Sequence, residues 1–189
     1  MNRKQLTNFV LRALFVALIF LLGFTPLGFI PLGFINVTIL CVPVVVGTLY
    51  MGPKNGMILG LTFGAVSFLN AMMKPSALVS TLMGASPLMV FVMSILPRVM
   101  VPLAAWSTYK LVSRWNSHVA AAVGAACGSL TNTILYLGLM LLFYIMCGID
   151  TAGVLGLIGG TALIAGSAEA IAAAVLSTPI LAALRRVRK

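Results

Sequence analysis

Long apolar segments, each able to cross a lipid bilayer, constrain the fold of this chain more than any other feature. The stretch from residue 9 to residue 24 holds a single charged side chain, Arg12, and similar stretches follow along the sequence. Charged residues make up 7% of the 189 residues, against about 25% in a soluble domain. A soluble fold of this size could not bury the 61% that are hydrophobic, so we expect an outer surface that faces lipid.

Turn signals rich in glycine and proline divide the apolar sequence into predicted helices. We place six, at residues 9–24, 38–51, 56–73, 87–109, 119–146 and 154–184, with KPSALVSTLMGAS as a linker between the third and the fourth. The first apolar run lacks the small-residue cleavage site of a signal peptide, so we expect it to be the first span. The predicted fold is an all-α membrane protein, one bundle of six transmembrane helices over residues 1–189.

The net charge of +10 is distributed as in a membrane protein rather than a nucleic-acid-binding one. In the six-span topology, the outer connections hold Lys74, and the basic residues of the termini and the inner connections share the opposite side. That side carries Arg3, Lys4, Arg12, Lys54, Lys110, Arg114, Arg185, Arg186, Arg188 and Lys189. Cytoplasmic connections carry such an excess of Lys and Arg, so we expect both termini in the cytoplasm and no nucleic-acid partner.

The stretch TPLGFIPLGFIN repeats Pro-Leu-Gly-Phe-Ile and falls outside, between the first two predicted helices. Proline and glycine disfavour a helix, yet the side chains are apolar. Irregular backbone at membrane depth is tolerated where it packs on protein or covers a cavity. The segment is therefore either a lid folded onto the bundle or an apolar plug or anchor.

Arg98, in SILPRVMVPLAAW, and Glu169, in AGSAEAIAAAV, are the charges placed deep in predicted spans. Buried charges are costly in a membrane, so each needs a partner. The two side chains either form a salt bridge between the fourth and sixth helices or line a polar cavity that receives a solute. The planar fork of arginine matches the two oxygens of a carboxylate.

Uncharged polar residues extend this candidate site. Asn70 ends the third predicted helix, and Asn132 shares a helix face with Ser129 and Tyr136. An amide both donates and accepts hydrogen bonds, which suits a ligand with hydroxyl and amide groups. Such residues also join helices in membrane bundles without any ligand.

Small residues spaced by four indicate close helix contacts. Gly56, Gly60 and Gly64 predict a contact within the bundle, whereas Ala13 and Ala17 on the first helix could face another protein.

Catalytic, nucleotide-binding and metal-binding motifs are missing from the sequence. It contains no G-x-x-x-x-G-K-[ST] loop and no H-E-x-x-H motif, and its cysteines have no metal-ligand spacing. We therefore expect no enzymatic activity, no cofactor and no metal.

Several segments together resemble a known family, the substrate-binding S components of energy-coupling factor (ECF) transporters. The similarity is carried by ALFVA in the first helix, by IPLGFINVTILCVPVVVGTLYMGPKNGMILGLTFGAVSFLN across the next two, by GSLTNTILYLG in the fifth and by GSAEAIAAAV in the sixth. The resemblance implies a subunit of an ABC importer in a prokaryotic cell membrane. It would capture a vitamin outside, topple in the bilayer and deliver the vitamin by docking on a transmembrane coupling subunit with two cytoplasmic ATPases.

The resemblance also implies roles for single residues. Ala13 and Ala17 would contact the coupling subunit. The first outer loop would be the gate, with Pro26, Phe29, Pro31, Phe34 and Asn36 as its residues.

The phrasing around PLGFIN, GPKNG and SFLN looks most like the pantothenate branch of the family. Pantothenate carries a carboxylate, an amide and two hydroxyls, which suit a site made of Asn70, Arg98, Asn132, Tyr136 and Glu169. The segment AMMKPSALVSTLMGAS departs from that branch and leaves riboflavin, folate or a thiamine precursor as alternatives. A different alternative is a six-span scaffold protein of a cell-envelope assembly, with no solute.

Overall fold

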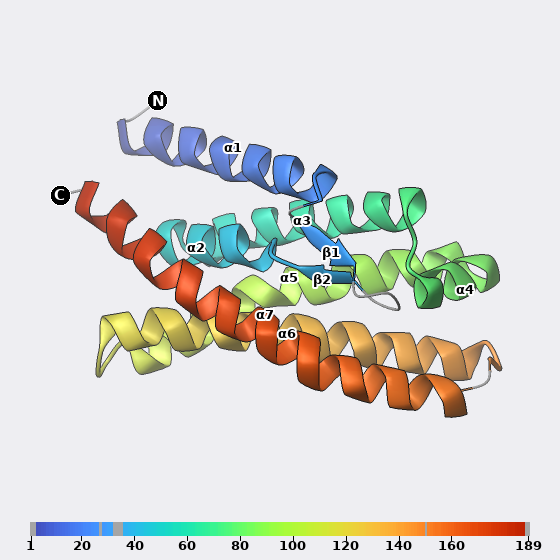
Figure 1. Cartoon of the computed structure of the whole chain (residues 1–189). Coiled ribbons are helices and arrows are strands. Elements are labelled where there is room, and N and C mark those ends of the chain that lie inside the picture. Colours follow the sequence, from blue (N-terminus) through green and yellow to red (C-terminus); the bar gives the residue numbers. More distant parts are fainter. Residues whose placement is uncertain (1–2, 27, 32–35, 150, 188–189) are drawn as a thin grey trace.

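The computed structural model describes residues 3–26, 28–31, 36–149 and 151–187, which form a helical bundle with one short hairpin (Figure 1). The long helices run along a common direction, and both ends of the chain lie at the same end of the bundle. In chain order the elements are α1 Arg3–Phe24, β1 Phe29–Pro31, β2 Asn36–Thr38, α2 Cys41–Met51, α3 Pro53–Met73, α4 Ala77–Ala85, α5 Pro87–Val112, α6 Ser117–Met146 and α7 Ala152–Val187.

Five of these helices, α1, α3, α5, α6 and α7, are long and apolar enough to cross a membrane. Their bounds agree with the predicted helices to within a few residues, except that α1 begins six residues before residue 9. The predicted second span is shorter than expected, because residues 38–40 precede α2 and the helix has 11 residues. At 1.5 Å per residue it is about 16 Å long, half of a hydrocarbon core.

The described residues contain three further elements that are not expected from the sequence, helix α4 and strands β1 and β2. The stretch predicted as a linker after the third helix forms the nine-residue helix α4, which buries Leu78, Val79 and Leu82. The doubled PLGFI segment supplies β1 and leads into β2, and these strands pair antiparallel with Phe29 opposite Thr38 and Pro31 opposite Asn36. The bundle is therefore helical with a small hairpin between α1 and α2.

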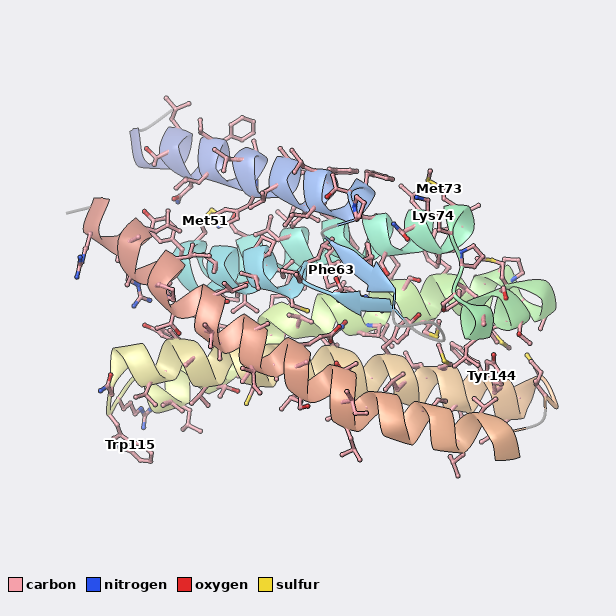
Figure 2. The ribbon with its side chains drawn as sticks, viewed as in Figure 1. Met51, Phe63, Met73, Lys74, Trp115 and Tyr144 are labelled. Carbon is pink, nitrogen blue, oxygen red and sulfur yellow. The ribbon has the colours of Figure 1, made fainter. Side chains whose placement is uncertain are left out.

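The connections other than the hairpin lie toward the two ends of the bundle. Figure 2 shows Met51 and Trp115, which lie at the α2–α3 and α5–α6 connections, toward the end that holds both termini. Lys74 and Tyr144 lie toward the opposite end. The α2–α3 and α5–α6 connections thus share one end of the molecule with both termini, and Lys74 lies toward the other end.

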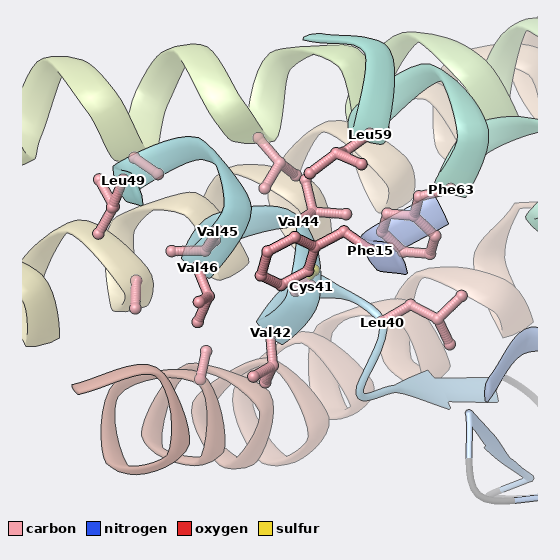
Figure 3. Close-up of a cluster of buried hydrophobic side chains, with 14 of the residues drawn as sticks. Phe15, Leu40, Cys41, Val42, Val44, Val45, Val46, Leu49, Leu59 and Phe63 are labelled. Carbon is pink, nitrogen blue, oxygen red and sulfur yellow. The ribbon is translucent and has the colours of Figure 1, made fainter. Parts of the chain in front are cut away.

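Helix α2 is the centre of the larger hydrophobic core (Figure 3). Residues 41–49 are all buried, so α2 presents no polar face. Phe15 and Ile19 of α1 and Leu59 and Phe63 of α3 are buried in the same cluster. A helix that is apolar on every side must be enclosed by protein or lipid, and its neighbours enclose this one.

The predicted glycine stripe of α3 makes contacts inside the bundle. Gly56 faces the side chain of Thr48 on α2, and Gly64 lies against Ile95 and Ser94 on α5. At Gly60 a Cβ atom would stand 2.5 Å from the carbonyl oxygen of Arg98. Gly60 and Gly64 let the backbones of α3 and α5 approach, and of these two glycines Gly60 leaves the smaller space, at Arg98.

We predict that Gly60→Ala lowers the free energy of unfolding by about 1–3 kcal/mol, because its methyl group meets rigid backbone. Gly138→Ala on α6 is the matched control, since a Cβ there has no neighbour within 4 Å. This control should leave stability unchanged or raise it slightly, because alanine favours a helix. Thermal unfolding in detergent measures both variants. Equal stability of Gly60→Ala and wild type would show that α3 and α5 can separate at no cost.

Candidate functional site

One cavity between the helices is lined by all five residues that the sequence analysis assigned to a ligand site: Asn70, Arg98, Asn132, Tyr136 and Glu169. Helices α3, α5, α6 and α7 build its walls, and the hairpin adds Phe29 and Thr38. The α3–α4 connection contributes Lys74, which is exposed, whereas Arg98 is 4% exposed. About 640 Å³ of space between atoms lies in the cavity and at its mouth, with open solvent included.

Arg98 is held by contacts from three helices. Its Nη1 donates a hydrogen bond of 3.0 Å to the carbonyl oxygen of Met93 on the same helix, α5. Its Cζ lies 4.4 Å from the centre of the Tyr136 ring on α6 and 5.4 Å from that of Phe63 on α3. These cation–π contacts offset part of the cost of burying the charge.

The Nε of Arg98 is buried and has no hydrogen-bond partner among the described residues. Asn132, 3% exposed, presents a second unpartnered atom, its Oδ1. Buried polar atoms are almost always hydrogen-bonded, so an unpaired donor and an unpaired acceptor in one cavity indicate a missing partner. Two residues that line the cavity therefore carry a polar atom without a partner, an N–H of Arg98 and an amide oxygen of Asn132.

Asn70 has a structural contact as well as a place in the cavity wall. Its Nδ2 donates a 3.0 Å hydrogen bond to the carbonyl oxygen of Gly23, which joins α3 to the end of α1. The residue thus fixes the point where the chain leaves α1 for the hairpin.

Glu169 and Arg98 do not form the salt bridge that the sequence left open. The carboxylate of Glu169 accepts a 2.6 Å hydrogen bond from the backbone N–H of Thr38 and a 3.0 Å bond from the hydroxyl of Thr133. The first bond ties strand β2 to α7, and the second ties α6 to α7. Glu169 is therefore committed to the hairpin and to α6, while Arg98 keeps an unpaired nitrogen.

The residues expected to gate the cavity are only partly described. Phe29 of β1 lines the cavity, Pro26 is exposed between α1 and β1, and Pro31 and Asn36 pair across the hairpin. Phe34 lies outside the described residues. The hairpin thus borders the cavity.

Ala13 and Ala17 of α1 are exposed, and they share the outer face of the helix with Leu14, Leu18 and Leu21. The inner face of α1 carries Phe15 and Ile19. The alanine pair therefore lies away from the bundle, not within it.

The profile of a protein family described as "ECF transporter, substrate-specific component" matches residues 7–181. The chain belongs to this family. It is also 30% identical, over 161 residues, to the pantothenic acid transporter PanT of Lactococcus lactis subsp. cremoris strain MG1363. That alignment covers 80% of this chain and 79% of PanT.

The S component so identified is a multi-pass membrane protein and a substrate-binding subunit of a transporter. Its long apolar helices and its polar cavity agree with that role. Several polar lining residues of this S component were not found from its sequence: Thr38, Ser67, Lys74, Ser76 and Thr133. Threonine and serine are frequent in membrane helices, so type and spacing do not single them out. The signal that could have indicated Thr38 and Thr133 is Glu169, because a buried carboxylate needs hydrogen-bond donors nearby.

We predict that Glu169→Ala detaches the hairpin of the S component, because the Thr38 N–H loses its acceptor. Glu169→Gln should have a milder effect, since an amide oxygen can still accept that bond. Hydrogen–deuterium exchange of a peptide containing Thr38 should be fastest in Glu169→Ala. Ser167→Ala is the control on α7, because that exposed hydroxyl bonds to carbonyls of its own helix. Exchange in Glu169→Ala as slow as in wild type would show that β2 is held by other contacts.

Proposed function

We propose that this S component binds pantothenate on the outer side of a prokaryotic cell membrane and delivers it to the cytoplasm. Delivery occurs by docking on an ECF transmembrane coupling subunit that carries two ATPases. Membership of the family supports the subunit's role, and the similarity to a protein named as a pantothenic acid transporter supports the ligand.

The observation that carries the ligand assignment is the unpaired Nε of Arg98, a residue that lines the cavity. The guanidinium has no acidic hydrogen-bond partner among the described residues, so a ligand carboxylate can bind it. The unpaired Oδ1 of Asn132 can accept a hydrogen bond from a ligand hydroxyl or amide N–H. Pantothenate supplies these complementary groups in a small molecule.

Riboflavin and a thiamine precursor are less well matched, because neither carries a carboxylate to bind the Arg98 guanidinium. Folate does carry carboxylates, so a direct comparison of affinities is needed to separate it from pantothenate. A scaffold without a solute would leave the unpaired atoms of Arg98 and Asn132 unexplained. These contrasts favour a small polar anion.

We predict that Arg98→Gln yields a folded protein that binds pantothenate roughly tenfold to a hundredfold more weakly. A hydrogen bond to a charged group contributes about 1.5–3 kcal/mol, which corresponds to that range. Pantothenyl alcohol, which lacks the carboxylate, should be affected far less. Arg114→Gln is the control, because Arg114 is exposed and lies outside the cavity.

Calorimetric titration of the purified proteins, with riboflavin, folate and thiamine in parallel, measures these affinities. Wild-type binding of pantothenate by Arg98→Gln would refute the carboxylate contact. If the wild-type protein binds another vitamin tightly and does not bind pantothenate, the assignment of pantothenate as the ligand is refuted.

The hairpin is the proposed gate of this site. Phe29 and Thr38 line the cavity, and the Thr38–Glu169 hydrogen bond closes the hairpin onto α7. Among the described residues, one side-chain hydrogen bond ties the strands of this cover to α7, so the cover can open at modest cost. Its apolar side chains suit a segment that meets lipid when the S component topples.

The outer face of α1 is the proposed contact with the coupling subunit. Ala13 and Ala17 lie one turn apart, so a partner helix can approach the backbone of α1 closely there. The exposed leucines around them supply apolar area. In the proposed orientation both termini and the basic connections lie in the cytoplasm, on the side of the ATPases.

We predict that Ala13→Trp and Ala17→Trp leave pantothenate affinity unchanged and abolish uptake by cells or by proteoliposomes with the complete transporter. Ile171→Trp is the control, because Ile171 is 64% exposed on a different helix, α7. The control should transport normally, since a large side chain is tolerated in lipid. Loss of binding together with uptake in the alanine variants would place the pair in an internal contact instead.

A further inference from the structure

Helix α5 contains two prolines in its interior, Pro97 and Pro102, on either side of Arg98. Proline has no backbone N–H, and its ring pushes aside the carbonyl four residues earlier. The two prolines therefore deprive the carbonyls of Met93 and Arg98 of their usual intrahelical donors. All three residues Met93, Pro97 and Arg98 are buried, so those carbonyls need partners from the protein.

The carbonyl that Pro97 leaves without a donor is the one that the Arg98 guanidinium binds. Nη1 of Arg98 reaches back five residues to the oxygen of Met93 at 3.0 Å and takes the place of the missing N–H. One bond thus completes the helix and anchors one end of the guanidinium. The Phe63 and Tyr136 rings limit its rotation. A second nitrogen of the same group, Nε, is left unpaired in a residue that lines the cavity.

We propose that Pro97 is a positioning residue for ligand recognition: by freeing the Met93 carbonyl it holds the Arg98 guanidinium in place for an anionic group of the ligand. This inference rests on the proposed function. A group held in its binding geometry before the ligand arrives loses less freedom on binding, so the anion binds more tightly. A proline that only bends α5 would affect all ligands alike.

The test is Pro97→Ala, which restores an N–H for the Met93 carbonyl and withdraws the anchor of Arg98. We expect pantothenate affinity to fall roughly tenfold and pantothenyl alcohol affinity to stay within about twofold. The melting temperature should be unchanged or higher, because alanine favours a helix interior over proline. Pro102→Ala is the matched control: it lies in the same helix and is also buried, but the carbonyl it frees is not bonded to the guanidinium.

A double-mutant cycle separates positioning from bending. If Pro97 acts through Arg98, adding Pro97→Ala to Arg98→Gln should weaken pantothenate binding no further. Pro97→Ser, which also restores the N–H, serves as the second variant if Pro97→Ala does not fold.

Two results would overturn the role of Pro97 while leaving pantothenate as the ligand. Pro97→Ala could keep the wild-type preference for pantothenate over pantothenyl alcohol, or it could lose affinity for both ligands by the same factor. A wild-type protein that binds no pantothenate would refute the proposed function itself, and the inference with it.

Discussion

A guanidinium enclosed by apolar helices is the constraint on which the centre of this structure depends. An unpaired charge at membrane depth costs at least a few kcal/mol, so the elements around Arg98 must compensate for it. The Met93 carbonyl does so within α5, and the Tyr136 and Phe63 rings do so from α6 and α3. Gly60 lets α3 pack directly against the backbone at Arg98. Groups from three helices therefore surround this one side chain.

The two buried charges are kept apart, and this separation gives the cavity its chemical character. The side-chain oxygens of Glu169 accept hydrogen bonds from Thr38 and Thr133, so Glu169 holds the hairpin and α6. Had it paired with Arg98, both charges would be neutralised and the cavity would offer nothing to an anion. With Glu169 committed elsewhere, the unpaired nitrogen of Arg98 is a binding group.

The sequence predicts the helical bundle and the composition of the site well, for physical reasons. Long apolar runs identify the five long helices, and rare buried charges and amides must converge on a polar space, so Arg98, Asn132 and Glu169 fall in one cavity. The partner of Glu169 could not be predicted, because a backbone N–H such as that of Thr38 belongs to every residue. Helix α4 was missed because a nine-residue apolar segment between proline and glycine signals resembles a loop. The length of α2 is smaller than predicted because the apolar run of its sequence continues into the hairpin.

Helix α1 supplies none of the described residues that line the cavity. It packs on the bundle through one face, with Phe15 and Ile19, and leaves the other face with Ala13 and Ala17 outside. Substitutions in the cavity walls therefore need not disturb that outer face, and changes on the outer face need not reach the cavity. Such an arrangement is modular in evolution: one scaffold can diverge in the molecule it recognises while it keeps the surface by which it meets other proteins.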